Sequence, residues 1–533
     1  MVETLQHAGR RVFSLFENAF DAAFGPRLNP LFHLGALSFL FFWVVLASGV
    51  YLYIFFETSI DGAYRSVESL THTQWYAGGI ARSLHRYASD AMVIAVLLHL
   101  LREFTLDRYR GVRWYAWVTG VLLLWLLYAS GIGGYWLAWD RLAQYIAVVT
   151  TEWLDWLPLF GESIARNFLN STTVNDRFFS LLSFIHVSVP LFLLLGSWIH
   201  IVRISRARTN PPRPLAIGAL LALVALAALR PALSQGPANL DTVVSTVSLD
   251  WFYLAAYPLI DIWSRGAVWA LLAGGTLLLL LLPWLPRRRE QPAATVHLAN
   301  CNGCGRCFAD CPYSAVILRP RSDGLPFETE AVVDASLCTA CGICVGACPT
   351  ATPFRRLAEL IPGIDMPQLT VRAVRERTLA AAAPLTGTDR VIVYGCHGGP
   401  DLSILNGAGV AAVTLPCVAA LPPSFIDFAI SRHHADGVLL AGCKAGDCYQ
   451  RLGIEWTEQR LQGRRDPYLR ARVPAARVAT CWAGPRGAAQ VLRELAAFRA
   501  RLRSLGPYRR DGETPPRSPV PNPEVGDVAY RVG

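Results

Sequence analysis

Long apolar runs fill the chain up to residue 287, and shorter alternating segments replace them afterwards. A hydrocarbon core of ~30 Å needs about 20 consecutive apolar residues in a helix. The pattern therefore predicts six spanning helices, the fifth being the shortest, at residues 34–56, 84–104, 114–136, 178–203, 214–231 and 265–285. The first 25 residues are amphipathic instead, which predicts a helix lying on the membrane surface.

The second half of the chain shows three further patterns. Residues 291–352 are rich in cysteine, and residues 353–386 favour a linker. Residues 387–505 alternate short β-rich runs with helical stretches, which is typical of a small α/β domain. Residues 506–533 are rich in Pro, Arg and Glu and favour a disordered tail. The predicted fold is multidomain: an all-α transmembrane bundle over residues 1–286, a small α+β domain and a small α/β domain.

The net charge of +10 follows from membrane topology more than from a nucleic-acid partner, which is not expected. Arginines gather beside the apolar spans, and the positive-inside rule assigns them to the cytoplasmic side; they lie within residues 102–113, 203–213 and 287–289. Six spans return the chain to that side. All thirteen cysteines follow residue 300, which suits a reducing compartment. We expect a multi-pass protein of the inner (cytoplasmic) membrane with its second half in the cytoplasm.

Two histidine pairs share one spacing within the apolar spans. His85 and His99 are 14 residues apart, and so are His186 and His200. Fourteen residues are just under four helical turns, so each pair shares one helix face with its members about 21 Å apart. Two axial imidazoles give a low-spin electron-transfer haem. The pattern predicts two stacked haems b in the bundle; a lone histidine would more often be a packing residue.

Glycines and arginines accompany the histidines. The same interval of 14 residues separates two pairs of glycines, Gly35 and Gly49, and Gly120 and Gly134. A haem edge approaches a helix closely only where no side chain intervenes, although helix–helix packing also selects glycine. Arg82 and Arg102 lie three residues outward of His85 and His99. They would pair with haem propionates or extend to the membrane interface.

The stretches SLHRYASD, WYAWVTG, GYWLAWDRLAQ and FIHVSVP resemble cytochrome b of the bc and bf quinol-oxidising complexes, particularly the short bf type. The resemblance implies an outer haem on His85 and His186 and an inner haem on His99 and His200.

The same resemblance bears on two further positions. The family's quinol loop, PEWY, reads Leu249-Asp250-Trp251-Phe252 here. Asp250 keeps a carboxylate that could accept a quinol proton, the alternative being a turn residue at the interface. His33 stands where the bf type has a cysteine, so no thioether-linked haem is expected.

Eight cysteines form two C-x₂-C-x₂-C-x₃-C-P runs. In two-cluster ferredoxins the fourth cysteine of each run binds the other cluster. The runs therefore predict two 4Fe-4S clusters, one on Cys301, Cys304, Cys307 and Cys348, the other on Cys338, Cys341, Cys344 and Cys311. Structural zinc would show two pairs with a longer gap between them.

Four more cysteines follow predicted strands, namely Cys396, Cys417, Cys443 and Cys448. Their chemistry suits a 2Fe-2S cluster or zinc about equally, and reactive or structural cysteines are a lesser alternative. The segments LPCVAALPPSFIDFAI and ADGVLLAGCKAGDCY resemble the delta subunit of methyl-viologen-type hydrogenases, which feeds electrons to heterodisulfide-reductase flavoproteins. That resemblance implies a 2Fe-2S cluster on the four cysteines. His397 takes the place of a further cysteine of that family and is a minor alternative ligand, and Cys481 is expected to be a buried thiol.

These patterns predict an electron-transfer protein and a subunit of a quinone-dependent oxidoreductase complex. A cytosolic flavoprotein or a heterodisulfide-reductase or hydrogenase-like subunit would exchange electrons through the clusters and haems with a membrane quinone. Reversed flow, a quinol-oxidising bc-like core, and a redox sensor or anchor without turnover are the alternatives. A homodimer through the cytochrome b part is left open. No nucleophile–base set or phosphate loop is present in the sequence.

Overall fold

The computed structural model describes residues 2–158, 163, 169, 174–285, 291–356, 358, 360–405 and 407–508. It divides into two compact units, Met1–Glu290 and Gln291–Gly533. We describe each unit by itself. The predicted tail lies outside the described residues beyond residue 508, and so does the arginine run at 287–289.

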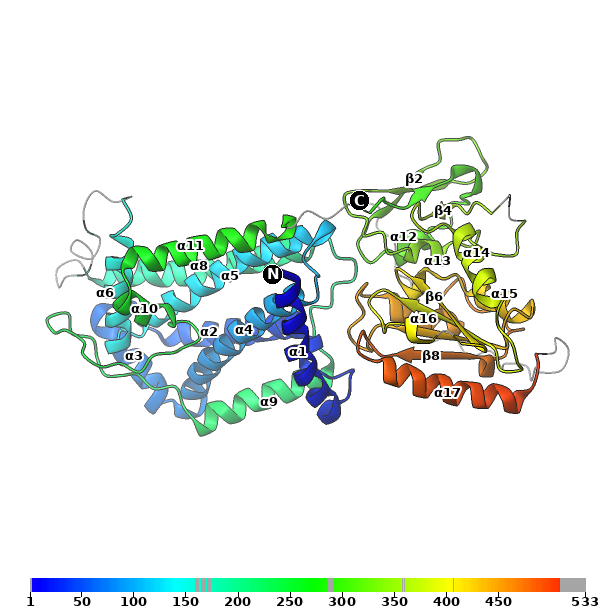
Figure 1. The fold of residues 1–533 in the computed structure, drawn as a ribbon. Helices are drawn as coiled ribbons and strands as arrows, with labels where there is room; N and C mark the ends of the chain where they lie inside the picture. Colours follow the sequence, from blue (N-terminus) through cyan, green and yellow to red (C-terminus); the bar gives the residue numbers. More distant parts are fainter. Residues whose placement is uncertain are drawn as a thin grey trace. The chain divides into compact units, whose positions relative to one another are not determined.

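Four long helices form the centre of the first unit. They are α2 (Leu34–Phe55), α4 (Ile80–Thr105), α5 (Trp114–Leu137) and α8 (Asp176–Ile201). α2 packs along α4, and α5 packs along α8 (Figure 1). Side-chain oxygens begin several helices of this unit: Asn175 accepts bonds from the first amides of α8, and Asp140 does so for α6 (Arg141–Leu154).

Five helical segments among the described residues are long and apolar enough to cross a membrane. Four of them contain the central helices, and the fifth contains α11 (Arg265–Leu281). The predicted span at 214–231 forms α9 (Arg213–Leu229), an apolar helix of 17 residues that packs on α4. The helical membrane bundle is thus confirmed, while the count of six spans stays a prediction.

Shorter helices surround the bundle. The amphipathic start of the chain forms α1 (Val2–Phe24), whose Gln6 side chain donates to the carbonyl of Phe104 at 3.0 Å. α1 packs against the end of α4 that carries Arg102.

Two further short helices lie between the spans in the sequence. They are α3 (Ile60–His72) and α10 (Ala256–Ile262), and α10 follows the loop that contains Asp250.

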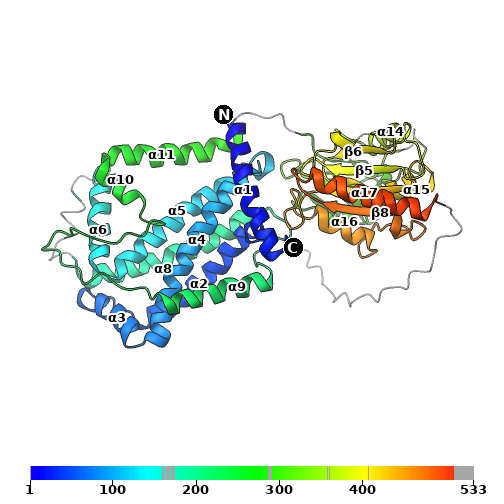
Figure 2. The same cartoon turned by 60° about the horizontal axis from the view of Figure 1, so that its bottom comes forward.

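A parallel four-stranded sheet organises the second unit. Its order is β6 (Val410–Leu415), β5 (Val391–Cys396), β7 (Gly437–Gly442) and β8 (Val478–Trp482). β5 and β7 are buried along their whole length, which explains their continuous apolar sequence. α17 (Ala488–Leu505) lies along one face, as Figure 2 shows, and α15 (Pro423–Ser431) packs on β7. The predicted small α/β region is confirmed.

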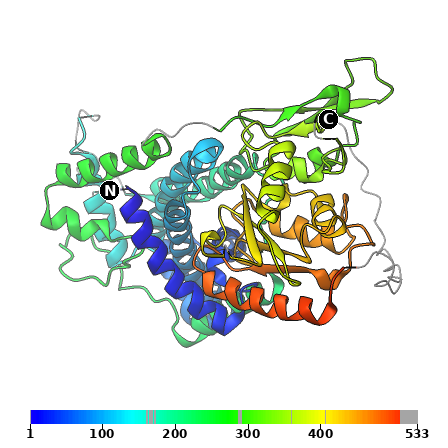
Figure 3. The same cartoon turned by 45° about the vertical axis from the view of Figure 1, so that its right-hand side comes forward.

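The cysteine-rich part has two one-turn helices, α12 (Arg306–Asp310) and α13 (Ile343–Ala347), packed together. Gly305 and Gly342 precede them with φ of 69° and 77°, a conformation that glycine adopts without strain. An antiparallel hairpin, β2 (Val316–Pro320) and β3 (Thr329–Val333), connects α12 to α13 along the chain (Figure 3).

The segment 353–386, expected to be a linker, contains regular structure. β4 (Ile364–Asp365) pairs with β1 (Thr295–Val296), and α14 (Val371–Ala382) packs on β6. The physical reason is that Val371 and Val374 form an apolar face that the sheet buries. This part of the linker prediction differs from the structure.

The helix α16 (Gly453–Leu461) also belongs to the second unit. It and α13 both pack against the turn at 418–420.

Candidate metal centres

His85 of α4 and His186 of α8 face each other across the first unit. Their ring centroids are 6.3 Å apart and their planes are inclined by 63°. Two metal–imidazole bonds of about 2 Å, with roughly 1.2 Å from each nitrogen to its ring centre, would together span about 6.4 Å. The separation therefore fits one iron held between the two imidazoles.

Backbone carbonyls orient these two rings. Nδ1 of His85 is 3.0 Å from the carbonyl oxygen of Val45, and Nδ1 of His186 is 3.1 Å from that of Ser130. Each Nδ1–H donates to its carbonyl, which leaves Nε2 as the nitrogen with a free lone pair. Such outer contacts hold an imidazole in the tautomer that a metal requires.

Glycines lie directly against these rings. A Cβ built on Gly49 would be 2.9 Å from Cε1 of His85, and one on Gly134 would be 2.8 Å from Cε1 of His186. Any side chain there would displace the imidazole. The repeated glycines thus make room for the histidine rings, and their contact with a haem edge stays a prediction.

The second histidine pair has the same design with looser contacts. A Cβ on Gly120 would be 3.2 Å from Cε1 of His200, and one on Gly35 would be 3.7 Å from Cε1 of His99. Nδ1 of His200 is 3.0 Å from the hydroxyl of Thr119. The structure therefore sets each predicted histidine against its predicted glycine.

Both predicted propionate partners already contact carboxylates of the protein. Nη2 of Arg102, which is 3% exposed, is 2.9 Å from Oε1 of Glu17 in α1. Nη1 of Arg82 is 3.4 Å from Oε1 of Glu68 in α3. A guanidinium has five N–H donors, so a propionate would share each arginine with its glutamate.

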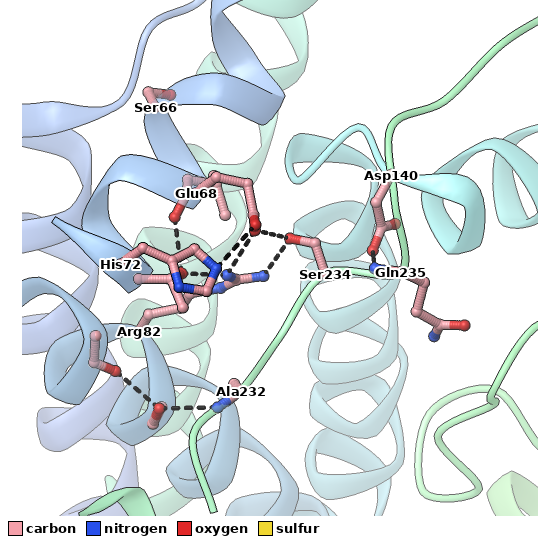
Figure 4. A network of polar contacts seen from close by, with 12 residues as sticks. Ser66, Glu68, His72, Arg82, Asp140, Ala232, Ser234 and Gln235 are labelled. Atoms are coloured by element: carbon pink, nitrogen blue, oxygen red, sulfur yellow. Dashed lines mark hydrogen bonds and ion pairs between the residues drawn. The ribbon is translucent and has the colours of Figure 1, made fainter. Parts of the chain in front are cut away.

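Arg82 belongs to a wider polar network, drawn in Figure 4. Its Nη2 donates to Ser234 at 2.7 Å, and the hydroxyl of Ser234 donates to Glu68 at 2.6 Å. Farther along, the amide of Gln235 donates to Asp140 at 2.9 Å. These bonds fasten the chain after α9 to α3, α4 and α6, and so position the following loop.

That loop carries Asp250, which is 8% exposed. Its Oδ2 is 3.0 Å from Nη2 of Arg86 and accepts a bond from the hydroxyl of Tyr135. Arg86 also contacts Asp90 at 3.2 Å. Sequence reasoning missed these partners, although an acidic residue inside an apolar span, such as Asp90, is itself a signal of function.

The eight cysteines of the two runs line two cavities. Each cavity contains three cysteines of one run and the fourth cysteine of the other run, as predicted for a two-cluster ferredoxin. One cavity is lined by Cys301, Cys304, Cys307 and Cys348. The other is lined by Cys311, Cys338, Cys341 and Cys344. Within the described ranges, no three His, Cys, Asp or Glu side chains converge to hold a single metal ion. Cavities surrounded by thiols suit multi-iron clusters better than zinc, whose ligands meet at one point.

Burial keeps several of these thiols protonated when no metal is bound. It raises the pKa of Cys307 to about 12, assisted by the neighbouring thiols, and it raises that of Cys341 to about 12. Thiolate, not thiol, is the ligand of iron. Cluster assembly at these residues therefore has to release protons.

The four later cysteines lie near one another beyond the carboxyl ends of β5, β6 and β7. Sγ of Cys396 is 3.3 Å from Sγ of Cys443. A Cβ on Gly453 would be 2.5 Å from Sγ of Cys417 and 3.3 Å from Sγ of Cys448. The set therefore needs a glycine at the start of α16.

Two neighbouring side chains stay apart from this set. His397 is exposed, which does not favour it as a ligand. Cys481 is buried in the core beneath the sheet, where it was expected as a plain thiol.

Three family models match three segments of the chain. Cytochrome b/b6/petB matches residues 20–208, the 4Fe-4S dicluster domain matches 300–352, and the delta subunit of methyl-viologen-reducing hydrogenase matches 406–506. The three predicted resemblances are confirmed. The matched segments contain the four histidines and eleven of the twelve predicted cluster cysteines, Cys396 lying before residue 406.

The chain is also similar to individual proteins. Cytochrome b6 of Porphyra purpurea is 29% identical over 191 residues, which are 35% of this chain and 87% of the relative. Cytochrome b6 of Auxenochlorella protothecoides is 28% identical over the same shares. A solved structure titled hyperthermophilic respiratory Complex III matches 48% of this chain and 75% of its own, with 22% identity and a TM-score of 0.41.

The chain is thus a membrane electron-transfer protein with segments that match cytochrome b, the 4Fe-4S dicluster domain and the hydrogenase delta subunit. Haem b and iron–sulfur clusters are the cofactors that these segments imply.

Proposed function

We propose that this protein carries electrons from a cytosolic low-potential donor to a membrane quinone, as a subunit of a quinone-dependent oxidoreductase. The observation that carries the proposal is the pair of facing imidazoles, His85 and His186, at the separation that one iron needs. When bound, two haems b, two 4Fe-4S clusters and one 2Fe-2S cluster supply one-electron transfer. The chain's own residues hold, space and insulate these groups.

Two cysteine sets of the second unit lie side by side. Cys341 of the second 4Fe-4S set and Cys417 of the 2Fe-2S set belong to one small buried cluster, which also contains Ile343 and Trp456. Cys307 and Cys344, from the two 4Fe-4S sets, pack in the same core. This order supports a route from the delta-subunit segment through one 4Fe-4S site to the other.

A buried ion pair fixes the spacing between those sites. Nη2 of Arg460 in α16 is 2.5 Å from Oδ2 of Asp310, the residue before Cys311, and Nη1 donates to the carbonyl of Ala419 at 2.8 Å. Trp456 donates from its ring to the carbonyl of Asp310 at 3.1 Å. The ferredoxin and delta-subunit segments are therefore held in one arrangement around their cysteines.

The two family matches indicate the electron donor and the electron acceptor. The delta-subunit match favours a hydrogenase-like or heterodisulfide-reductase-type flavoprotein as the donor. The cytochrome b match favours quinone as the acceptor, with Asp250 as the group that exchanges the quinone proton. Arginines beside the spans favour the inner membrane, with the second unit on the cytoplasmic side.

The test uses membranes that contain the full chain, under anaerobic conditions. A reduced low-potential ferredoxin is added as donor, and haem b absorbance and quinol formation are followed. We expect haem reduction followed by quinol formation. Haem that dithionite reduces but that neither the ferredoxin nor quinol reduces would refute the proposal and favour a sensor or an anchor.

A matched pair of variants tests the route. Cys443→Ala should abolish haem reduction by the ferredoxin while dithionite still reduces the haems. Cys481→Ala, in the same domain but away from the cysteine set, should leave the ferredoxin reaction unchanged. Reduction of the haems at the original rate in Cys443→Ala would exclude entry through this site. Reduction of the haems by quinol, blocked by inhibitors of the outer site, would instead support a bc-like direction.

A further inference from the structure

A pair of acidic side chains is buried inside the first unit. Asp90 of α4 is 9% exposed and Asp250 of the loop is 8% exposed. Asp90 lies within a segment long and apolar enough to cross a membrane. Charged groups at such depth are costly, so they are retained mainly where they act on ions, protons or ligands.

The guanidinium of Arg86 contacts both acidic side chains. Arg86 contacts Oδ2 of Asp90 at 3.2 Å through Nε and Oδ2 of Asp250 at 3.0 Å through Nη2. Its guanidinium also lies 4.6 Å from the ring centre of Tyr135. With both acids ionised, the cluster would carry one uncompensated negative charge in a buried place, which is strongly disfavoured.

One carboxylate oxygen of the pair has no hydrogen-bond donor near it among the residues that the structure describes. Oδ1 of Asp90 is buried and has no hydrogen-bond partner among the described residues. The carboxyl groups of Asp90 and Asp250 are nevertheless close together, because each has its Oδ2 within 3.2 Å of the same guanidinium, that of Arg86. Two ionised carboxylates cannot bond to each other because both only accept. A single proton between them would satisfy the orphan oxygen and remove the extra charge.

The other titratable groups around the pair are neutral tyrosines. Tyr135 of α5 donates to Asp250, and Tyr128 of α5 donates to the carbonyl of Phe252 at 3.2 Å. The hydroxyl of Tyr253 is 2.7 Å from that of Ser89, the residue next to Asp90. No second cation is paired with either acid in the described parts of the chain.

We propose that Asp90 and Asp250 share one proton and form the proton-exchanging part of a quinone site. The proposal rests on the proposed quinone function and adds Asp90 to it. A quinol hydroxyl gives one proton to the Asp250 carboxylate, and the proton already held between the acids passes to Asp90, while the electrons of the quinol leave through the proposed haem sites; reduction of a quinone runs the same transfers backwards. Arg86 keeps both carboxyl groups in place and balances the one negative charge of the singly protonated pair.

The test compares Asp90→Asn, Asp250→Asn and Asp241→Asn in the full chain with its cofactors. Asp241 is an exposed acid in the same loop and serves as the control. One readout is the infrared signal of a protonated carboxyl that shifts in heavy water. The other is quinone turnover as a function of pH. Haem b absorbance reports that each variant is folded.

We expect Asp90→Asn and Asp250→Asn each to abolish the carboxyl signal, because one proton belongs to both residues. Each should lower quinone turnover by about a hundredfold, while Asp241→Asn changes neither readout. Asp90→Glu, which restores a carboxyl group, should keep the signal and most of the turnover. If Asp90→Asn loses haem, the test rests on Asp90→Glu. An infrared carboxyl signal that is retained at a shifted position supports the shared proton. A carboxyl signal at the original position overturns it.

The two proposals fail in different ways. A carboxyl signal and a pH profile kept in Asp90→Asn but lost in Asp250→Asn would mean that Asp250 acts alone, which overturns the shared proton. Turnover and signal unchanged in both variants would overturn the quinone site as well. Loss of the signal in both variants with turnover unchanged would leave the proton pair and remove its role with quinone.

Discussion

The guanidinium of Arg460 lies 2.5 Å from the carboxylate of Asp310, 150 residues earlier in the chain. Both side chains are at most 3% exposed. Asp310 directly precedes Cys311, and Arg460 lies in the last turn of α16, the helix that begins beside Cys417 and Cys448. One ion pair therefore joins the surroundings of two predicted clusters.

Asp310→Asn should destabilise the second unit by about 3–5 kcal/mol, because it leaves the Arg460 charge buried without its partner. The thermal midpoint of the full chain's second unit should fall by roughly 10 °C. Arg372→Gln is the control, since its pair with Glu376 is half exposed and should contribute at most about 0.5 kcal/mol. Equal midpoints for the two variants would show that the buried pair does not hold the unit together.

Gly134→Ala should remove the outer haem, because the new Cβ would stand 2.8 Å from the His186 ring. Gly133→Ala, on the next residue of the same helix, meets nothing within 4 Å and should keep both haems. The haem content per chain, measured from the absorbance of the extracted haem, should fall by about half in the first variant only. A full haem content in Gly134→Ala would contradict the idea that the glycine makes room for a ligating imidazole.

Asp365 should make the second unit less stable as the pH rises from about 4 to about 6. Burial raises the pKa of Asp365 from 3.8 to about 6, although the amides of Met366 and Val371 donate to it and act in the opposite direction. The folded state therefore holds the proton more tightly than the unfolded chain, and this contribution to stability is present below pH 4 and lost above about pH 6.

Asp365→Asn cannot titrate, so its stability should vary less across that interval. Denaturant unfolding of the full chain at pH 4.5 and pH 6.5 measures the difference. The same pH slope in both proteins would show that Asp365 ionises normally.

Reporter fusions should show that α9 crosses the membrane. With six spans, a reporter after Leu240 would lie outside and one after Gln291 would lie in the cytoplasm. If α9 does not cross, both reporters change sides, because only five spans remain. A phosphatase that is active only outside, fused at each position, distinguishes the two topologies.

Much of the site can be read from local sequence patterns. The 14-residue intervals of His85 and His186 with their partners, and the spacing of the cysteine runs, follow from helix geometry and from short loops around a cluster. Such patterns depend on residues that are near one another in the chain. For that reason the helical bundle, the α/β region and the three resemblances were predictable.

The tertiary structure alone decides which distant side chains meet. No local pattern indicates that Arg460 reaches Asp310, or that Arg86 holds Asp90 and Asp250 together. The glycine intervals were visible, yet their contact with the imidazoles depends on how α2 packs on α4 and α5 on α8. Sequence by itself determined the ligand types and their spacing along each element, because hydrophobic periodicity and coordination chemistry act locally. Charge pairing in the interior was decided by packing, because the burial of each charge depends on elements far apart in the chain.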